Sequence, residues 1–199
     1  MSLLGEAFRA ALQPCSYSLL ILAVVVLGLR GPRPRLPALG AFYAATTVFA
    51  WIPFVGVNPL LDGRLAGTIG LLAGLVLAGW HTFGSNVPAW LSMVGVGLVG
   101  GFAGATWLPC VGRELGTVLT AATRNPWPGL AGLALYLLGT MWVVIVLVVI
   151  ADYTPTVRRF FESVRVLIIF RMLGAILVVT VAIDTYPAVL SYLARISAL

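Results

Sequence analysis

The chain has very few charged side chains. Only 9% of its 199 residues are Asp, Glu, Lys or Arg, whereas 61% are hydrophobic, and the mean hydropathy is +1.07. A soluble domain needs a much more polar surface than this, so the composition excludes an ordinary water-soluble protein. It predicts an integral membrane protein whose apolar helices pack against lipid and against one another.

Lysine is absent from the sequence, and cysteine occurs only twice. All 12 basic residues are arginines scattered between apolar runs, with no tract long enough to follow a nucleic-acid backbone. The net charge of +6 is therefore interpreted as a membrane-topology signal, and we expect no nucleic-acid partner. Two cysteines exclude a disulfide scaffold and a complete zinc site, so we expect no bound metal. They suffice for one reversible disulfide.

Six apolar segments of near-bilayer length divide the sequence, separated by charged or turn-forming stretches such as 30–35 and 58–64. We predict an all-α integral membrane fold of six transmembrane helices in a single domain, 1–199. The fifth helix is expected to be continuous and to be followed by a loop over 152–164. The predicted spans are approximately 3–29, 39–57, 65–84, 88–122, 130–150 and 165–190.

Each cysteine follows a proline inside an apolar segment, as Pro14-Cys15 in the first span and Pro109-Cys110 in the fourth. A shift of 95 residues superposes these pairs and places spans one to three on spans four to six. Because three is odd, the two halves (about 1–87 and 88–199) enter the membrane from opposite sides, which predicts two inverted three-helix repeats. Proline removes a backbone donor, so we expect spans one and four to be kinked or broken at these pairs.

The arginines predict the orientation of the chain. Seven fall on the side of loops one, three and five, and four fall on the opposite side, with Arg113 left out as intramembrane. The bias predicts cytoplasmic odd-numbered loops and both termini outside. The seven are Arg30, Arg33, Arg35, Arg158, Arg159, Arg165 and Arg171.

Glycine is spaced for close helix packing in two places. The Gly70-x-x-x-Gly74 pattern in the third span predicts a tight contact with another backbone. The glycine-rich stretch 95–104 resembles a phosphate-binding loop only in composition, because it lacks lysine and lies within a span. We interpret it as a packing surface.

The residues around the cysteines resemble a known family. Pro14-Cys15 in the first span, together with Gly104-Ala-Thr-Trp-Leu-Pro-Cys-Val-Gly112 and Leu115-Gly116 in the fourth, is similar to the CcdA family of cytochrome c biogenesis proteins and the membrane domain of DsbD. The family often has proline three residues after each cysteine, where this chain has Ser18 and Arg113.

The resemblance implies a thiol-disulfide oxidoreductase in the cell inner (cytoplasmic) membrane. Cys15 and Cys110 would form the transferred disulfide, reduced by cytoplasmic thioredoxin and reoxidised by an extracytoplasmic thioredoxin-like protein in support of cytochrome c maturation. No cofactor is then needed. The physical requirements agree, since exchange needs a thiolate that a partner can reach, and proline and glycine such as Gly112 loosen the backbone there.

Three side chains near Cys110 are candidate supporting residues. Arg113 and Glu114 follow it by three and four residues and share its helical face, so the arginine would stabilise a thiolate and the glutamate relay a proton. Alternatively, these two neutralise each other or reach the interface. Trp107, beside the Pro-Cys pair, is a candidate shield for the cysteine.

A second function fits the same pattern. Inverted repeats also form small transporters, and such a protein would carry an ion or solute past Arg113 and Glu114. A third interpretation is an assembly scaffold with inert thiols, because free cysteine is often simply a buried apolar residue. Replacing both cysteines discriminates among these, since only the oxidoreductase requires them.

Overall fold

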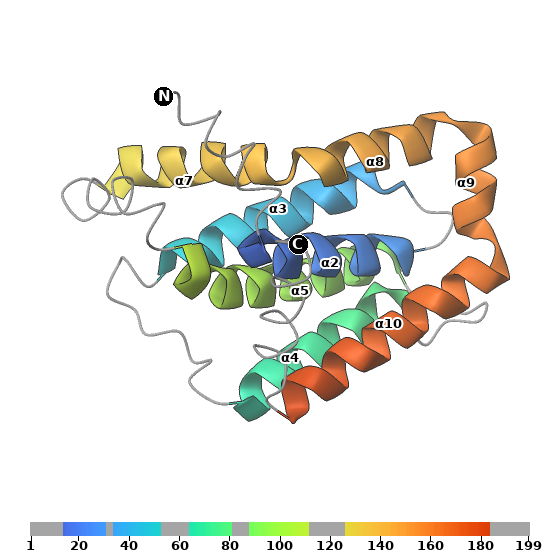
Figure 1. The fold of residues 1–199 in the computed structure, drawn as a ribbon, viewed down its shortest axis with the longest axis horizontal. Coiled ribbons are helices and arrows are strands. Elements are labelled where there is room, and N and C mark those ends of the chain that lie inside the picture. Colours follow the sequence, from blue (N-terminus) through green and yellow to red (C-terminus); the bar gives the residue numbers. More distant parts are fainter. Residues whose placement is uncertain (1–13, 31–33, 53–63, 81–87, 112–125, 184–199) are drawn as a thin grey trace.

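A computed structural model describes residues 14–30, 34–52, 64–80, 88–111 and 126–183. All regular structure within these ranges is helical, which confirms the predicted all-α class (Figure 1). The elements are α2 (Pro14–Gly28), α3 (Leu36–Trp51), α4 (Arg64–Leu75), the π-helical turn η2 (Val76–Trp80), α5 (Ala89–Val111), α7 (Pro126–Thr140), α8 (Trp142–Tyr153), α9 (Pro155–Glu162) and α10 (Val164–Ala182).

Prolines mark the starts of two helices. Pro155 is the first residue of α9, and Pro37 lies in the first turn of α3. Proline suits these positions because its fixed φ is helical and its missing N–H would have no partner in the first turn. Pro109 lies inside α5, two residues before the end of its described part. The predicted breaks of spans one and four stay predictions, because residues 1–13 and 112–125 lie outside the described ranges.

The helices alternate in direction along the chain. In Figure 1, α2, α3, α4 and α5 run back and forth, and the pair α7–α8 and then α10 do the same. The end of α2, the start of α3 and the whole of α9 lie at one end of this bundle, on the right in Figure 1. We call it the arginine end, because these segments and their junctions carry Arg30, Arg35, Arg158, Arg159 and Arg165.

Among the described residues, two helices are long and apolar enough to cross a membrane, α5 over Ala89–Thr106 and α10 over Val164–Ala182. The bent pair α7–α8 makes a third if it is counted as one span, and α2, α3 and α4 with η2 contain shorter apolar helices. The exposed faces of α8 and α10 are also apolar, as expected of surfaces that meet lipid. These faces include Val146, Leu147, Val149, Ile150, Ile168, Ile169, Met172, Leu173, Ile176 and Val179.

The prediction of a continuous fifth helix is wrong. The chain bends by 58° between α7 and α8 at Met141, whose φ of −86° and ψ of 4° lie outside the helical range. The Thr140 hydroxyl donates to the Tyr136 carbonyl at 2.9 Å. Such hydroxyl bonds to the preceding turn bend helices, and Gly139 next to it offers no side chain to resist the bend.

Two further boundaries differ from the sequence prediction. The expected loop 152–164 contains the helix α9, which begins at Pro155. The third span is not a regular helix throughout, because α4 ends at Leu75 and the chain continues as the wide turn η2. Gly79 in that turn has a φ of 136°, a conformation that residues with a Cβ rarely adopt.

Glycine packing is centred on α5, which contacts α2, α3, α4 and η2. A Cβ added to Gly100 would lie 2.6 Å from the Phe42 carbonyl oxygen of α3, and one added to Gly95 would lie 2.7 Å from the Gly74 carbonyl oxygen of α4. The packing role predicted for 95–104 is confirmed. For the third span the prediction holds at Gly74 only, because Gly70 has nothing within 4 Å of its Cβ position.

A threonine hydroxyl ties α3 to α5 at this contact. The Thr46 hydroxyl is buried and lies 2.8 Å from the Phe42 carbonyl of its own helix and 3.0 Å from the Gly100 carbonyl of α5. Interhelical hydrogen bonds of this kind accompany the close backbone approach that small residues allow.

Candidate functional site

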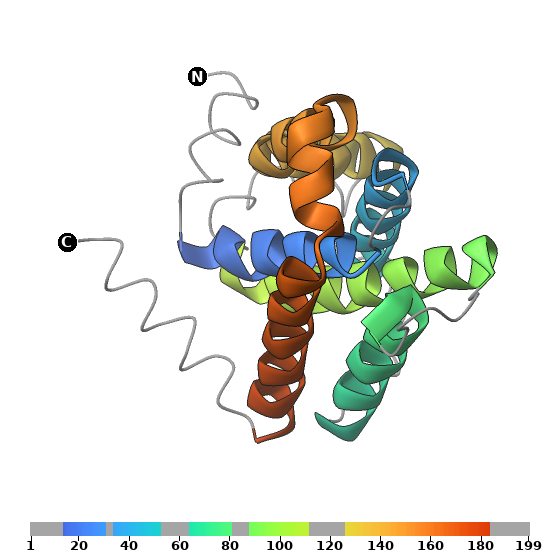
Figure 2. The same cartoon turned by 90° about the vertical axis from the view of Figure 1, so that its right-hand side faces the viewer.

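The two cysteine positions lie at the same end of a helix pair. Helices α2 and α5 pack against each other and run in opposite directions, as both Figure 1 and Figure 2 show. Cys15 lies near the beginning of the described part of α2, and Cys110 lies near the end of the described part of α5. Antiparallel packing therefore brings these two positions to a common end of the described helix pair, opposite the arginine end (Figure 1).

Position 15 lies on the buried face of α2. Leu19, Leu22 and Val26 follow it by four, seven and eleven residues, and all three are fully buried. Ser18, three residues on, is also buried. These spacings repeat along one side of an α-helix, so the backbone of Cys15 belongs to the side of α2 that faces the core.

Position 110 lies on a second buried strip. Val96 and Ala103 precede it by fourteen and seven residues, and both are buried. Around the α5 axis this strip lies between the side that meets α4 through Gly95 and the side that meets α3 through Gly100. Helix α2 is the other described helix that packs extensively on α5. The spacing thus places the backbone of position 110 on a buried side of α5.

Part of the predicted site falls outside the described residues. Gly112, Arg113 and Glu114 are not among them, and neither are the side chains of Trp107, the two cysteines and their preceding prolines. The structure therefore brings together the helix turns that carry the cysteines. The roles predicted for the supporting residues stay predictions.

Sequence reasoning missed a polar cluster at the arginine end. The Asp152 carboxylate, at the end of α8, accepts hydrogen bonds from the backbone N–H groups of Arg35 and Leu36 at 3.0 and 3.1 Å. Its other oxygen lies 3.3 Å from the Arg35 guanidinium in an ion pair. Asp152 thus caps the first turn of α3 and neutralises an arginine beside it.

The two described arginines of the charged stretch 30–35 are buried. The Arg35 side chain is only 4% exposed, and its guanidinium lies 5.2 Å from the centre of the Phe161 ring. Phe161 stacks on Phe170 with ring centres 6.0 Å apart. Arg30 is also buried and has Nη1 at 3.1 Å from the Met93 sulfur. In the sequence, the only indication of this cluster was Asp152, an acidic residue at the end of a predicted span.

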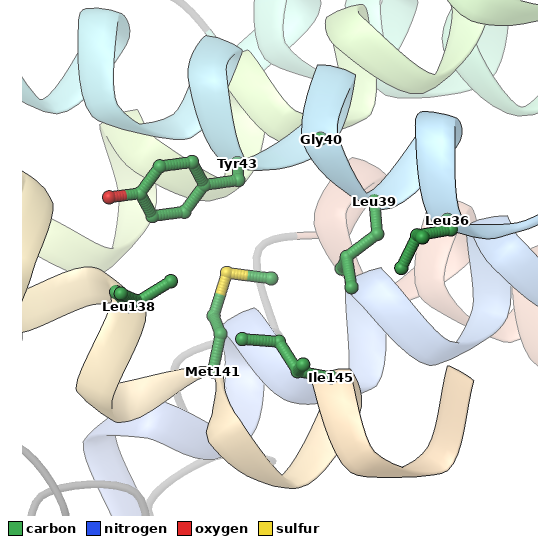
Figure 3. A pocket seen from close by; sticks show the side chains of 7 residues that line it. All are labelled: Leu36, Leu39, Gly40, Tyr43, Leu138, Met141 and Ile145. Carbon is green, nitrogen blue, oxygen red and sulfur yellow. The ribbon is translucent and has the colours of Figure 1, made fainter. Parts of the chain in front are cut away.

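An apolar pocket of about 240 Å³ opens between α3 and the bend of α7–α8. Figure 3 shows the Met141 side chain projecting toward it between Tyr43 and Ile145. The Tyr43 hydroxyl donates to the Ala134 carbonyl, so its polar atom is satisfied by the neighbouring helix. The pocket offers no charged group to a ligand. Within the described ranges, His, Cys, Asp and Glu residues do not gather in groups of three that would hold a metal ion.

Comparisons with known proteins identify no relative: no family model, curated protein or solved structure matches the chain.

Proposed function

We propose that this protein transfers reducing equivalents across a membrane by thiol-disulfide exchange through Cys15 and Cys110. The observation that carries the proposal is the antiparallel contact of α2 and α5, which brings the two Pro-Cys turns to one end of the pair on buried faces. The electron donor is cytoplasmic thioredoxin and the acceptor is an extracytoplasmic thioredoxin-like protein, an arrangement that serves cytochrome c maturation.

The exchange balances without a cofactor. A thiolate of the reduced donor attacks one sulfur of the Cys15–Cys110 disulfide and forms a mixed disulfide, and the second donor thiol then displaces it. The donor becomes a disulfide and the pair becomes a dithiol. The pair reduces the disulfide of the outer acceptor by the same two steps. Two electrons and two protons pass for each cycle.

The proposal includes an inverted repeat, an architecture suited to alternating access, and contacts between corresponding helices are compatible with it. Under the 95-residue shift, α3 corresponds to the region of α7–α8 and α4 to the region of α10. Helix α3 packs on α7 and α8, and α4 packs on α10, so each of these helices contacts its counterpart in the other half. The described parts of spans one and four, which follow Cys15 and precede Cys110, do not correspond to each other under this shift.

The proposed topology has six spans in the cell inner membrane, with the arginine end in the cytoplasm and both termini outside. The clustering of arginines at the junctions of α2 with α3 and of α8 with α10 supports this orientation. With alternating access, the cysteine pair would meet the donor on the cytoplasmic side and the acceptor on the outer side, one at a time.

Thiol trapping tests the proposal. Membranes are treated with an alkylating reagent that adds mass to each free thiol, before and after mild oxidation. We expect two labelled thiols in the reduced protein and none after oxidation. The variants Cys15→Ser and Cys110→Ser should each retain one reactive thiol and trap a mixed disulfide with a thioredoxin partner. Full labelling of both thiols after oxidation would overturn the proposal.

The transporter alternative receives no specific support from the described residues, because the pocket between α3 and α7–α8 is apolar and uncharged. It makes a distinct prediction. A transporter would keep its function in the double variant Cys15→Ser, Cys110→Ser, whereas the oxidoreductase would lose electron transfer to the outer acceptor completely.

A further inference from the structure

Helix α9 lies across the arginine end of the bundle. It joins α8 to α10 and runs at a steep angle to α2, α5 and α8 (Figure 1). If those helices cross the membrane, α9 lies along the membrane surface and not through it. Its sequence, Pro-Thr-Val-Arg-Arg-Phe-Phe-Glu, places basic and aromatic residues side by side. That combination is typical of helices that rest in the headgroup region.

The outer side of this region is both basic and apolar. Arg158, Arg159 and Arg165 are exposed. The large apolar side chains beside them are exposed as well, with Phe160 at 62% and Tyr153 at 77%. In water such aromatic exposure is unfavourable, whereas at a membrane interface the rings lie at the acyl boundary and the guanidinium groups reach the headgroups.

The inner side of α9 is held against the bundle. Phe161 stacks on Phe170 of α10 and lies against the Arg35 guanidinium, which in turn is paired with Asp152. These contacts fix the rotation of α9 about its axis. Phe160, the preceding residue, meets the Phe161 ring edge-on with ring centres 5.9 Å apart and remains largely exposed.

We propose that α9 and the adjoining start of α10 form an interfacial site for anionic phospholipids. Arg158, Arg159 and Arg165 bind the headgroup phosphate, and Phe160 and Tyr153 insert at the boundary of the acyl chains. Arginine is suited to phosphate because its planar guanidinium donates two parallel hydrogen bonds. In this segment only Glu162 opposes the three arginines, so the local charge favours an anionic headgroup over a zwitterionic one. The proposal does not depend on the redox function.

Native mass spectrometry of the full-length protein in detergent tests the site. The protein is titrated with phosphatidylglycerol or with phosphatidylcholine of the same acyl chains, and the lipid-bound fraction is measured. We expect the wild-type chain to prefer phosphatidylglycerol. The triple variant Arg158→Gln, Arg159→Gln, Arg165→Gln should lose this preference by about tenfold or more, because each arginine at an anionic surface contributes independently.

The matched control is the triple variant Arg9→Gln, Arg64→Gln, Arg195→Gln, which removes the same charge from the other predicted side. It should keep the preference. Circular dichroism and thermal unfolding establish that both triple variants fold. If the α9 triple variant is unstable, the single variant Arg159→Lys is measured as well. It keeps the charge and should retain most of the binding. Phe160→Ser should weaken binding of both lipids.

Three results would overturn the site. The α9 triple variant would bind phosphatidylglycerol as well as the wild type, the control triple would lose it equally, or inorganic phosphate would displace the lipid. If the α9 triple variant keeps its phosphatidylglycerol binding but no longer binds an acidic protein such as thioredoxin, the same arginines bind a protein partner instead.

Discussion

Asp152 joins two halves of the chain through a single carboxylate. Its two oxygens accept from the backbone of Arg35 and Leu36 and pair with the Arg35 guanidinium, and the partners are more than a hundred positions away in sequence. The Asp152 side chain is 18% exposed and that of Arg35 only 4%. Removing either partner would leave a poorly solvated charge, which is the expensive case for an ion pair.

Replacing Asp152 separates its two roles. Asp152→Asn keeps an oxygen that can accept from the first turn of α3 but loses the charge, so we expect the free energy of unfolding to fall by about 1–2 kcal/mol. Asp152→Ala loses the cap as well and should cost about 3 kcal/mol. Denaturant unfolding in detergent measures both. Equal losses of unfolding free energy in the asparagine and alanine variants would mean that the hydrogen bonds to the first turn of α3 contribute nothing.

The contact of Arg35 with Phe161 is tested by a double-mutant cycle. Arg35→Lys keeps the charge beside Asp152 but replaces the planar guanidinium that lies over the ring, and Phe161→Leu removes the ring. We expect a coupling energy of about 0.5–2 kcal/mol in unfolding experiments, because the cation is largely desolvated. Additive effects of the two substitutions would show that the ring serves only as packing.

At the scale of helices, α5 is organised by the positions of its glycines. Gly95 and Gly100 meet the backbones of α4 and α3 from different sides of the helix, whereas Gly97 has nothing within 4 Å of its Cβ position. Replacing glycine by alanine should therefore change the stability in opposite directions at neighbouring positions. Where another backbone is close, the clash with the added methyl group dominates. Where the space is open, the higher helix propensity of alanine dominates.

Alanine substitutions in α5 should reproduce this difference in sign. Gly100→Ala places a methyl group against the Phe42 carbonyl, and we expect a loss of about 1–3 kcal/mol in unfolding free energy. Gly97→Ala, the matched control, should be neutral or stabilising by up to about 1 kcal/mol, because alanine favours a helix over glycine. A similar loss at both positions would contradict the packing shown for α3 and α5.

The bend between α7 and α8 should depend on one hydroxyl. Thr140→Val removes the bond to the Tyr136 carbonyl at nearly constant shape, and Thr140→Ser keeps it. Spin labels at Trp127 and Tyr153, in a Cys15→Ser, Cys110→Ser background, report the end-to-end distance. We expect it to increase by up to about 5 Å in the valine variant, from the 1.5 Å rise per residue, and to stay unchanged in the serine variant. An unchanged distance in both would assign the bend to Gly139 and the surrounding packing.

Some features of these helices could be predicted from sequence and others could not. The stretch 95–104 was predictable as a packing surface, because several glycines within one span have few other uses. The bend at Met141 was not, since threonine and glycine occur in straight membrane helices and the outcome depends on the neighbours. Gly70 shows the same limit. Its spacing from Gly74 matches a packing motif, but only contact with another helix selects the face that is used.

For the whole molecule, access to the cysteine pair must alternate if electrons cross the membrane. Membrane-impermeant thiol reagents applied to right-side-out and inverted vesicles should label the reduced pair from both faces. A reagent that crosses the membrane serves as the control for total thiol. Labelling confined to one face under every redox condition would indicate a one-sided sensor, because a carrier has to expose the pair to each partner in turn.

The candidate site was partly predictable from sequence at this scale. The coincidence of Pro14-Cys15 with Pro109-Cys110 indicated which helices should meet, and α2 and α5 do pack together. The cluster at Asp152 was not predictable, because its partners are separated by 117 positions and carry no local motif. An acidic residue at a span end looks the same in sequence whether it faces water or caps a distant helix.

The cap supplied by Asp152 also bears on the order of biosynthesis. Helix α3 emerges from the ribosome long before residue 152, so during synthesis its first turn lacks the carboxylate that later accepts from Arg35 and Leu36. We infer that the first half inserts as an incompletely tied unit and that the arginine end closes only after α8 has been made. Protease digestion of arrested nascent chains would test this inference. Cleavage near Arg35 should stop once the chain extends past Asp152, and equal protection of shorter chains would contradict it.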